Sequence, residues 1–288
     1  MKQALIKLHI SVFLAGFTGV LGKLILLNEG PLVWYRIMLT VVTLFVFLSW
    51  KKKIQKIAPR NVWKLLGIGA LIALHWVCFY GSIKMANVSI GLICFASVGL
   101  FTAVLEPMMT TKKFSWAEIG LGLLSLLGIY LIFHFDTHYR TGILVGLLSA
   151  LLGALFSVLN KKNVDVAAPQ TLMLYELSGG LLILTVFMPL YLYYFPTDYL
   201  FPSLSDWGWL LVLSWLCTVL AMDLMLQSLQ KISAFTQNLT LNLEPVYGIA
   251  LAFALFHENE HLDTAFYIGF ALIAFSVVLQ MVRVVSRE

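Results

Sequence analysis

The sequence predicts an all-α integral membrane protein, with ten transmembrane helices in two inverted five-helix repeats. Three observations lead to this fold class: 60% of the 288 residues are hydrophobic, only 11% are charged, and the apolar residues form long runs joined by short polar connections. Soluble domains carry a charge at about one residue in four. The composition therefore leaves almost no chain for a soluble domain.

Each predicted span is long enough to cross the hydrocarbon core of a bilayer, which takes about 20 apolar residues in a helix. The first run contains Lys23 and has no small-residue cleavage site, so we expect a retained helix rather than a signal peptide. The short connections favour one compact bundle. The predicted spans are 7–27, 32–50, 64–83, 88–110, 116–134, 141–160, 170–194, 207–228, 233–256 and 264–284.

Basic residues are distributed unevenly between the two sides of the predicted bundle. With both termini inside, only Lys84 and Arg140 fall in outer loops, and this bias follows the positive-inside rule. We expect a multi-pass protein of the plasma (cytoplasmic or inner) membrane with both termini in the cytoplasm. The inner segments hold Lys2, Lys7, Lys51, Lys52, Lys53, Lys56, Arg60, Lys64, Lys112, Lys113, Lys161, Lys162, Lys231, Arg283 and Arg287.

The net charge of +5 is explained by the same bias. No basic face or base-stacking module accompanies the charge, so a nucleic-acid partner is not expected. The expected partners are the lipid bilayer and a small-molecule substrate, and the protein is expected to be a monomer or a homodimer.

The two halves of the chain, 1–134 and 135–288, resemble each other. Each half holds five predicted spans, an odd number, so the second half is expected to insert upside down relative to the first. Inverted repeats are characteristic of secondary transporters, whose substrate sites lie near the midplane between the repeats. The matched positions are Gly22-Lys23 with Asn160-Lys161, Tyr35-Arg36 with Tyr175-Glu176, and Gly99 with Pro245.

The order of these motifs resembles that of the EamA-type transporters of the drug/metabolite transporter superfamily. The resemblance implies a cavity lined mainly by the third, fourth, eighth and ninth helices, and export or exchange of small organic solutes. The sequence departs from the family pattern at Gly99, where a proline is often found, and at 257–262, where a shorter turn is usual. The motifs on which the resemblance to the EamA-type transporters depends are Gly22-Lys23, Tyr35-Arg36, Ser82-Ile-Lys84, Phe114-Ser to Gly120, and Leu243-Glu-Pro-Val-Tyr247.

The ninth span carries several polar residues inside an apolar run. Glu244 lies near its middle, directly before Pro245. A carboxylate at that depth costs about 2.5–3.5 kcal/mol, so it normally faces a cavity or a partner. Proline removes a backbone donor and kinks the helix. We therefore expect Glu244, Gln237 and Asn242 to contact the substrate; the alternative is hydrogen bonding between helices that only holds the bundle together.

Further candidate substrate contacts lie in the third and eighth spans. Asp223 lies about two turns from the inner end of its span, where it faces the cavity or pairs with a lysine. His75 and Phe79 share one helix face beside Trp76. Aromatic rings with one titratable group suit a planar or amphipathic solute, and a histidine among aromatics equally fits a packing role.

Four residues are candidates for moving parts. Gly99 and Pro245 weaken their helices at the same level of the two repeats, so they are the predicted hinges. Arg36 and Glu106 are the predicted gate residues. The alternatives are that Arg36 reaches the membrane interface and that Glu106 forms a salt link with Lys112 or Lys113.

These observations predict a secondary transporter that exports or exchanges a small organic metabolite by alternating access. An amino acid or a related amine is the first expectation, because the cavity candidates lean acidic. Proton coupling through Glu244 or Asp223 follows from their depth. No cofactor and no metal are expected, and no P-loop for ATP is present in the sequence.

The alternative function is an intramembrane zinc metallohydrolase. The segment His257-Glu-Asn-Glu-His261 matches the HExxH pattern, in which two histidines on one helix face bind zinc and the glutamate activates a bound water. Here the segment lies at the outer end of the ninth span and in the turn that follows. A solvated acidic turn is the favoured interpretation, so the chain is not expected to be an enzyme.

Overall fold

The computed structural model describes residues 2–135, 137–241 and 243–285. Helices and short connections make up this described part, which contains no strand. Seven long helices are continuous: α1 (Lys2–Leu24), α2 (Glu29–Trp50), α3 (Pro59–Met85), α6 (Trp116–Phe135), α7 (Arg140–Asn163), α8 (Pro169–Tyr194) and α13 (Thr264–Val285).

The other predicted spans are interrupted helices. The fourth consists of α4 (Val88–Phe95) and α5 (Val98–Met109), and the ninth of α11 (Ala234–Leu241) and α12 (Glu244–Phe256). The eighth is continuous but changes type, from α9 (Leu204–Ser214) through a π-helix, η2 (Trp215–Leu220), to α10 (Ala221–Leu229). Two short 3-10 helices, η1 (Thr137–Tyr139) and η3 (Glu258–His261), lie in connections.

Length and hydropathy make this an integral membrane protein. Seven stretches among the described residues are long and apolar enough to cross a bilayer. Shorter apolar helices occupy Trp116–Leu131, Glu244–Phe256 and Thr264–Ser276. Each predicted span therefore contains helix, whereas the full count of ten crossings stays a prediction.

Local sequence accounts for several helix starts. Proline occupies the first turn of α3, α8 and α12, where its missing amide hydrogen costs nothing. Asn87 caps α4, because its side chain accepts a hydrogen bond of 2.8 Å from the Ile90 amide. These signals place the helix starts within a few residues of the predicted spans.

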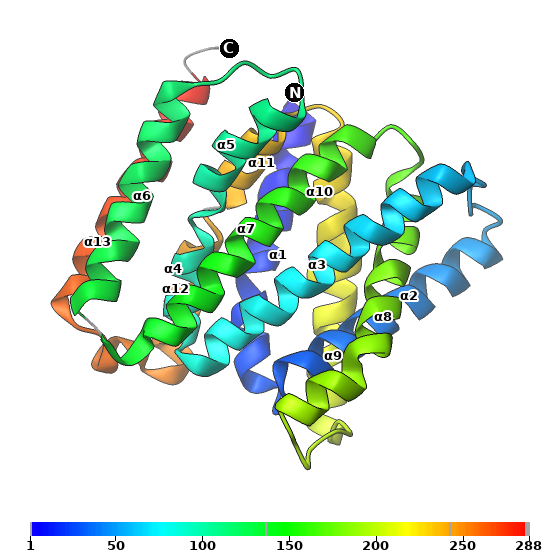
Figure 1. Ribbon diagram of the computed structural model, residues 1–288, viewed down its shortest axis with the longest axis horizontal. Helices are drawn as coiled ribbons and strands as arrows, with labels where there is room; N and C mark the ends of the chain where they lie inside the picture. The colour runs from blue at the N-terminus through cyan, green and yellow to red at the C-terminus, as the bar shows by residue number, and fades with distance from the viewer. Residues whose placement is uncertain (1, 136, 242, 286–288) are drawn as a thin grey trace.

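The described chain ends, Lys2 and Val285, lie at the same end of the bundle (Figure 1). We call this end the terminal face, and the other end the opposite face. Because neighbouring helices alternate in direction, the connections 51–58, 110–115, 164–168 and 230–233 also lie at the terminal face. The opposite face carries the connections 25–28, 86–87, 195–203 and 257–263.

The helices pack around α3, which contacts both α7 and α8 (Figure 1). The contact with α8 is very close at Gly69, where a side-chain Cβ would lie 1.5 Å from the carbonyl oxygen of Glu176. Only glycine allows the two backbones to approach so closely. α6 and α13 pair with each other at one side of the bundle.

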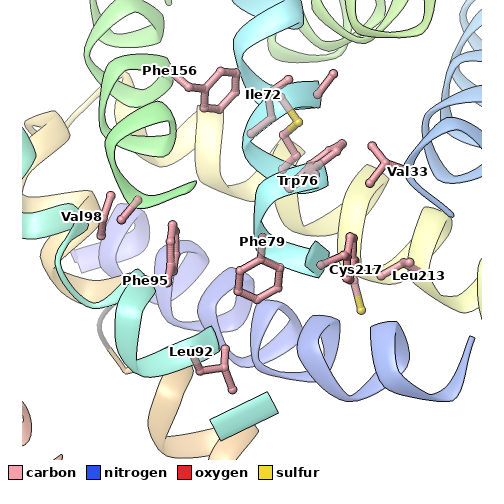
Figure 2. Close-up of a cluster of buried hydrophobic side chains, with 14 of the residues drawn as sticks. Val33, Ile72, Trp76, Phe79, Leu92, Phe95, Val98, Phe156, Leu213 and Cys217 are labelled. Carbon is pink, nitrogen blue, oxygen red and sulfur yellow. The ribbon is translucent and has the colours of Figure 1, made fainter. Parts of the chain in front are cut away.

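One large cluster of buried apolar side chains joins the two halves of the chain. Figure 2 shows Trp76, Phe79 and Phe95 within it, with side chains from α7, α9 and η2 around them. The Phe79 and Phe95 rings lie 5.9 Å apart, centroid to centroid, in an edge-to-face arrangement. This aromatic group forms one wall of the cavity described next.

Both predicted hinge residues follow a helix break. Gly99 lies in the first turn of α5, directly after the break at Ala96 and Ser97. Pro245 lies in the first turn of α12, after the end of α11. The fourth and ninth spans are therefore each divided near their middle, at matched positions.

Candidate functional site

A cavity lies beside the two helix breaks. Its volume is about 100 Å³, well below the roughly 300–1,000 Å³ of pockets that hold drug-sized ligands. Phe95, which precedes the first break, and Glu244, which follows the second, both line it. In this conformation the cavity has room for a small solute or a few waters.

The cavity wall includes five of the residues that the sequence singles out. α3, the eighth span and the ninth span line it as expected, whereas the fourth span contributes Phe95 alone. α1 and α7 each contribute as many lining residues as the ninth span does, and the sequence gives no sign of this. The predicted residues that line the cavity are Glu244, His75, Trp76, Phe79 and Arg36.

Two predicted substrate contacts, Asp223 and Gln237, are not part of this wall. The Asp223 carboxylate accepts hydrogen bonds from Gln170 (2.6 Å) and Gln227 (2.9 Å), which hold it near the start of α8 at the terminal face. Gln237 is fully buried, and its side-chain amide has no hydrogen-bond partner among the described residues. Asn242 lies outside the described residues.

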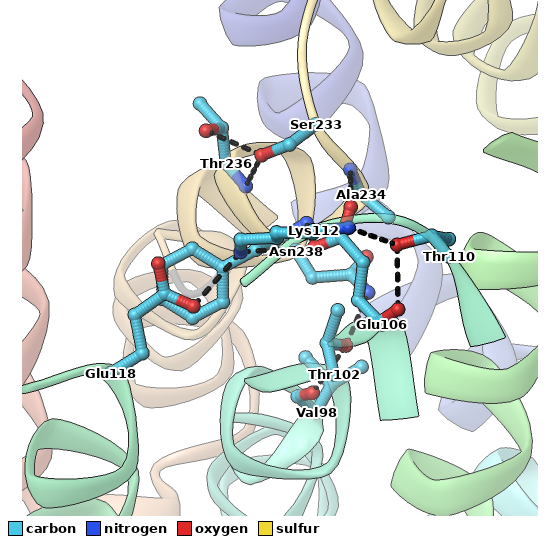
Figure 3. A network of polar contacts seen from close by, with 11 residues as sticks. Val98, Thr102, Glu106, Thr110, Lys112, Glu118, Ser233, Ala234, Thr236 and Asn238 are labelled. Carbon is cyan, nitrogen blue, oxygen red and sulfur yellow. Dashed lines mark hydrogen bonds and ion pairs between the residues drawn. The ribbon is translucent and has the colours of Figure 1, made fainter. Parts of the chain in front are cut away.

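Asn238 lines the cavity where Gln237 was expected. Its amide donates to the Thr102 hydroxyl (2.8 Å, Figure 3), and its oxygen accepts from the Ser157 hydroxyl (2.9 Å). In an unbroken helix, Gln237 and Glu244 would share one face, because they lie seven residues, or about two turns, apart. The break before α12 interrupts that spacing, so a different face of α11 points to the cavity.

Arg36 is buried in the wall, with 2% of its surface exposed. Its Nε donates to the Thr218 hydroxyl (2.8 Å), one terminal nitrogen donates to the Tyr80 hydroxyl (2.8 Å), and the other lies 3.4 Å from the Cys217 carbonyl oxygen. The guanidinium lies over the Trp76 ring, 3.8 Å from its centroid. Arg36 therefore does not reach the membrane interface, and it brings a fixed positive charge to the cavity.

The partners of Arg36 on the eighth span belong to the π-helix η2. The Thr218 hydroxyl donates to the carbonyl of Leu213, five residues earlier (2.8 Å). A π-helical turn shifts backbone pairing by one residue, which frees a carbonyl for other contacts, and such turns are frequent at functional sites. The Cys217 carbonyl, which contacts Arg36, belongs to this π-helical segment.

Glu244 is the acidic group of the cavity. Its side chain is buried, yet no described residue donates a hydrogen bond to its carboxylate. Arg36 is the positive group whose field acts on it. The cavity thus presents one held cation and one acid whose oxygens are open to a bound molecule.

His75 adds a defined hydrogen-bonding edge. Its Nδ1 lies 2.8 Å from the carbonyl oxygen of Ser149. Since a carbonyl oxygen only accepts, Nδ1 carries the hydrogen, and Nε2 of the neutral ring is an acceptor. The ring also packs on Phe95, 5.2 Å between centroids. His75 therefore serves both as a packing residue and as part of the cavity wall.

The predicted gate residue Glu106 binds the start of α11 at the terminal face. Its two carboxylate oxygens accept hydrogen bonds from the amides of Ala234 and Phe235, both at 3.0 Å. Lys112 lies 3.1 Å from Glu106 and 2.8 Å from Glu118 (Figure 3). We call these five residues the terminal latch. The salt link that the sequence offered for Glu106 is present, and a gating role stays a prediction.

A matching group closes the start of α4 at the opposite face. The Glu258 carboxylate accepts hydrogen bonds from the amides of Val88 (3.2 Å) and Ser89 (3.0 Å) and from the Ser89 hydroxyl (2.7 Å). Lys23 pairs with it at 2.8 Å. We call these four residues the opposite latch. Amides at a helix start carry partial positive charge, so both latches place a carboxylate where a helix favours an anion.

The geometry does not support the zinc-hydrolase alternative. The HExxH segment forms a 3-10 turn rather than an α-helix, so it lacks the helix face that would hold two histidines together. His257 adopts a left-handed backbone conformation and is exposed, and the side chain of His261 lies outside the described residues. Glu258 is buried and bound in the opposite latch, which also differs from the expected solvated turn.

The chain is similar to known proteins in both sequence and fold. A model described as the EamA-like transporter family matches residues 3–134 and 140–281. One solved crystal structure of a protein is 14% identical to this chain, with a TM-score of 0.72, and the match covers 100% of this chain and 99% of that one. At that identity the likeness shows a shared fold alone. A comparison with curated proteins found no match.

Proposed function

Because the chain belongs to the EamA-like transporter family, we propose that it is a secondary transporter that exports or exchanges a small organic metabolite by alternating access. The family comprises transporters of the drug/metabolite transporter superfamily, not enzymes. The observation that carries the proposal is the cavity, in which the Arg36 guanidinium and the Glu244 carboxyl group lie between two interrupted helices. Interrupted helices at the midplane are typical of substrate sites in secondary transporters.

The proposed architecture has ten crossings in two inverted repeats, 1–134 and 135–288. The terminal face is assigned to the cytoplasm, because the lysine-rich connections gather there. The protein would reside in the plasma (cytoplasmic or inner) membrane as a monomer or homodimer. Gly99 and Pro245 would act as the hinges, since each directly follows a break.

The proposed substrate class is an amino acid or a related amine. An ammonium group matches the open oxygens of Glu244, and a carboxylate matches the remaining guanidinium hydrogens of Arg36. His75, Trp76 and Phe79 would provide the side of the cavity that contacts an apolar or planar group. The small volume of the cavity supports a small solute over a large one.

Counterflow in proteoliposomes tests this function. Vesicles loaded with an unlabelled amino-acid mixture are expected to take up the labelled mixture saturably and faster than empty vesicles. Glu244→Gln should lower the rate about tenfold or more, as expected when a charge-assisted hydrogen bond is lost. Glu260→Gln is the matched control, because Glu260 is 65% exposed and far from the cavity wall. No saturable counterflow by the wild type would rule out the amino-acid class.

Proton coupling is part of the proposed function. It is tested by comparing uptake with and without a pH gradient in the same vesicles. The depth of Glu244 and Asp223 in their predicted spans makes them the first candidates for the proton-binding residue. The packing around a third acid, Glu176, makes it a further candidate.

A further inference from the structure

A few polar side-chain atoms in the described part of the bundle are buried without a hydrogen-bond partner. In the described part of the chain, the fully buried side-chain atoms without a partner belong to Asn160, Glu176 and Gln237, whereas the Glu244 carboxyl group, which also lacks a donor, borders the cavity. Buried polar groups are nearly always hydrogen-bonded, so each exception needs a physical reason. Two of these three residues, Asn160 and Glu176, contact each other.

This pair lies directly below the cavity, on the side of the terminal face. Asn160 follows the cavity-lining residue Phe156 by four positions on α7, which is one helical turn. On α3, Gly69 precedes the lining residue Ile72 by three positions, and Gly69 lies against the backbone of Glu176. Neither Asn160 nor Glu176 lines the cavity itself. The pair is therefore a neighbour of the substrate site and separate from it.

The surroundings of Glu176 leave its carboxyl group almost without hydrogen bonds. The side chain has no exposed surface. One oxygen accepts a long hydrogen bond of 3.4 Å from the Asn160 amide, and the other has no described partner. Charge-assisted hydrogen bonds to a carboxylate are typically about 2.7–2.9 Å. The side-chain oxygen of Asn160 is also without a partner.

No positive charge compensates Glu176 from the packed elements. The charged and titratable groups on those elements that point inward are bound elsewhere: Arg36 of α2 to Thr218 and Tyr80, His75 of α3 to Ser149, Lys161 of α7 to the Leu229 carbonyl, and Asp223 of α10 to two glutamines. Arg60 and Lys64 of α3 are exposed at the terminal face. An ionised carboxylate here would be an unpaired buried charge, which proteins avoid by neutralising the group. The packing therefore fits the carboxylic acid.

We propose that Glu176, together with Asn160, forms a proton-binding site outside the substrate cavity, and that this proton is the one coupled to transport. The second part rests on the proposed transport function. While Glu176 is buried as in this structure, its carboxylic acid keeps the proton. When the terminal face opens, water reaches Glu176, the O–H bond breaks, and the proton passes to water while the carboxylate gains hydration. Glu244 remains the acid that binds substrate.

Infrared spectroscopy of the purified protein in lipid nanodiscs tests the proton site without any substrate. The wild type is expected to show the C=O stretch of a buried carboxylic acid at neutral pH. Glu176→Gln should remove that component, and Asn160→Leu should shift it, because the acid loses its hydrogen-bond partner. Asp223→Asn is the matched control and should leave the band unchanged, since the Asp223 carboxylate accepts two amide hydrogen bonds. Identical spectra for wild type and Glu176→Gln would overturn the proton site.

Transport in proteoliposomes tests the coupling. A pH gradient is expected to change uptake of the labelled amino-acid mixture several-fold in the wild type and not at all in Glu176→Gln. Counterflow without a gradient should persist in this variant, because glutamine mimics the protonated acid. If the variant still responds to the gradient as the wild type does, the coupling role is wrong and the transport function stands. If the wild type transports nothing, the transport function and the coupling fall together, and the infrared result decides the proton site.

Discussion

The two latches close opposite faces of the bundle with the same chemistry and different residues. Each uses a buried glutamate to bind the first amides of an interrupted helix, α11 at the terminal face and α4 at the opposite face. In each, a lysine pairs with the glutamate and lies 4.4 Å from the centroid of a phenylalanine ring. Similar latches at both ends are consistent with the proposed transport mechanism, in which the two faces of the bundle open in turn.

The latches differ in how many groups hold the lysine and the glutamate. Lys112 bridges two carboxylates and its side chain is 26% exposed, whereas Lys23 binds one carboxylate and is 39% exposed. Glu258 gains the Ser89 hydroxyl as an extra donor. The lysine therefore matters more in the terminal latch, and the helix-start contacts matter more in the opposite latch.

Removal of either latch glutamate, Glu106 or Glu258, is expected to lower the free energy of unfolding more than any other latch substitution. Glu106→Ala and Glu258→Ala each leave two buried amides without an acceptor and a lysine without this partner, at a cost of about 2–4 kcal/mol in unfolding free energy. Denaturant unfolding in mixed micelles measures the loss. Glu260→Ala, in the same turn as Glu258, is the exposed control and should change stability by less than about 0.5 kcal/mol. Equal stabilities for all three variants would contradict the latch account.

Removal of the lysines should separate the two latches. Lys112→Met leaves two largely buried carboxylates near each other, so we expect a loss of about 1–2 kcal/mol. Lys23→Met should cost about 0–1 kcal/mol, because the partly exposed pair is weak and Glu258 keeps three other donors. The same unfolding measurement compares them. A larger loss of unfolding free energy for Lys23→Met than for Lys112→Met would contradict the conclusion that the lysine contributes more to the terminal latch.

Acid is expected to weaken the opposite latch. Burial raises the pKa of the Glu258 carboxyl, but the hydrogen bonds from Lys23 and Ser89 outweigh it, so the pKa is below the ordinary glutamate value. A carboxyl whose pKa is lowered by folding contributes stability above its unfolded pKa of about 4.3 and loses it as the pH falls through the folded pKa. Unfolding measured from neutral to acidic pH should show this decline, and Glu258→Gln should flatten part of it. An unchanged profile in the variant would contradict this cause.

The sequence predicts the helices well because their signals are local. The run 88–110 contains α4 and α5, and the break before α12 coincides with Pro245, whose missing amide hydrogen is visible in the sequence alone. The cavity acid Glu244 and the cavity aromatics could be predicted from their depth in the apolar runs, which is also a local property of the sequence. Glu244 and Trp76 are examples, and both line the cavity.

The two latches could not be predicted from the sequence, because the residues that bind each other in them are distant along the chain. Glu258 binds Lys23, 235 positions away, and no local spacing marks that pair. The HExxH pattern suggests zinc chemistry, whereas in the structure the Glu258 carboxylate accepts a hydrogen bond from an amide at the start of α4. Asn238 was missed for another reason: helical spacing cannot be carried across a break whose rotation the sequence does not define.

Side-specific labelling of Cys217 tests alternating access most directly. This cysteine lines the cavity, and Cys78→Ala with Cys94→Ala leaves it as the sole thiol of the chain. In oriented vesicles, a membrane-impermeant maleimide should reach Cys217 from the terminal face in Glu106→Ala and from the opposite face in Glu258→Ala. Labelling of both variants from the same face, or of neither from any face, would contradict a cavity that opens in turn to the two sides of the membrane.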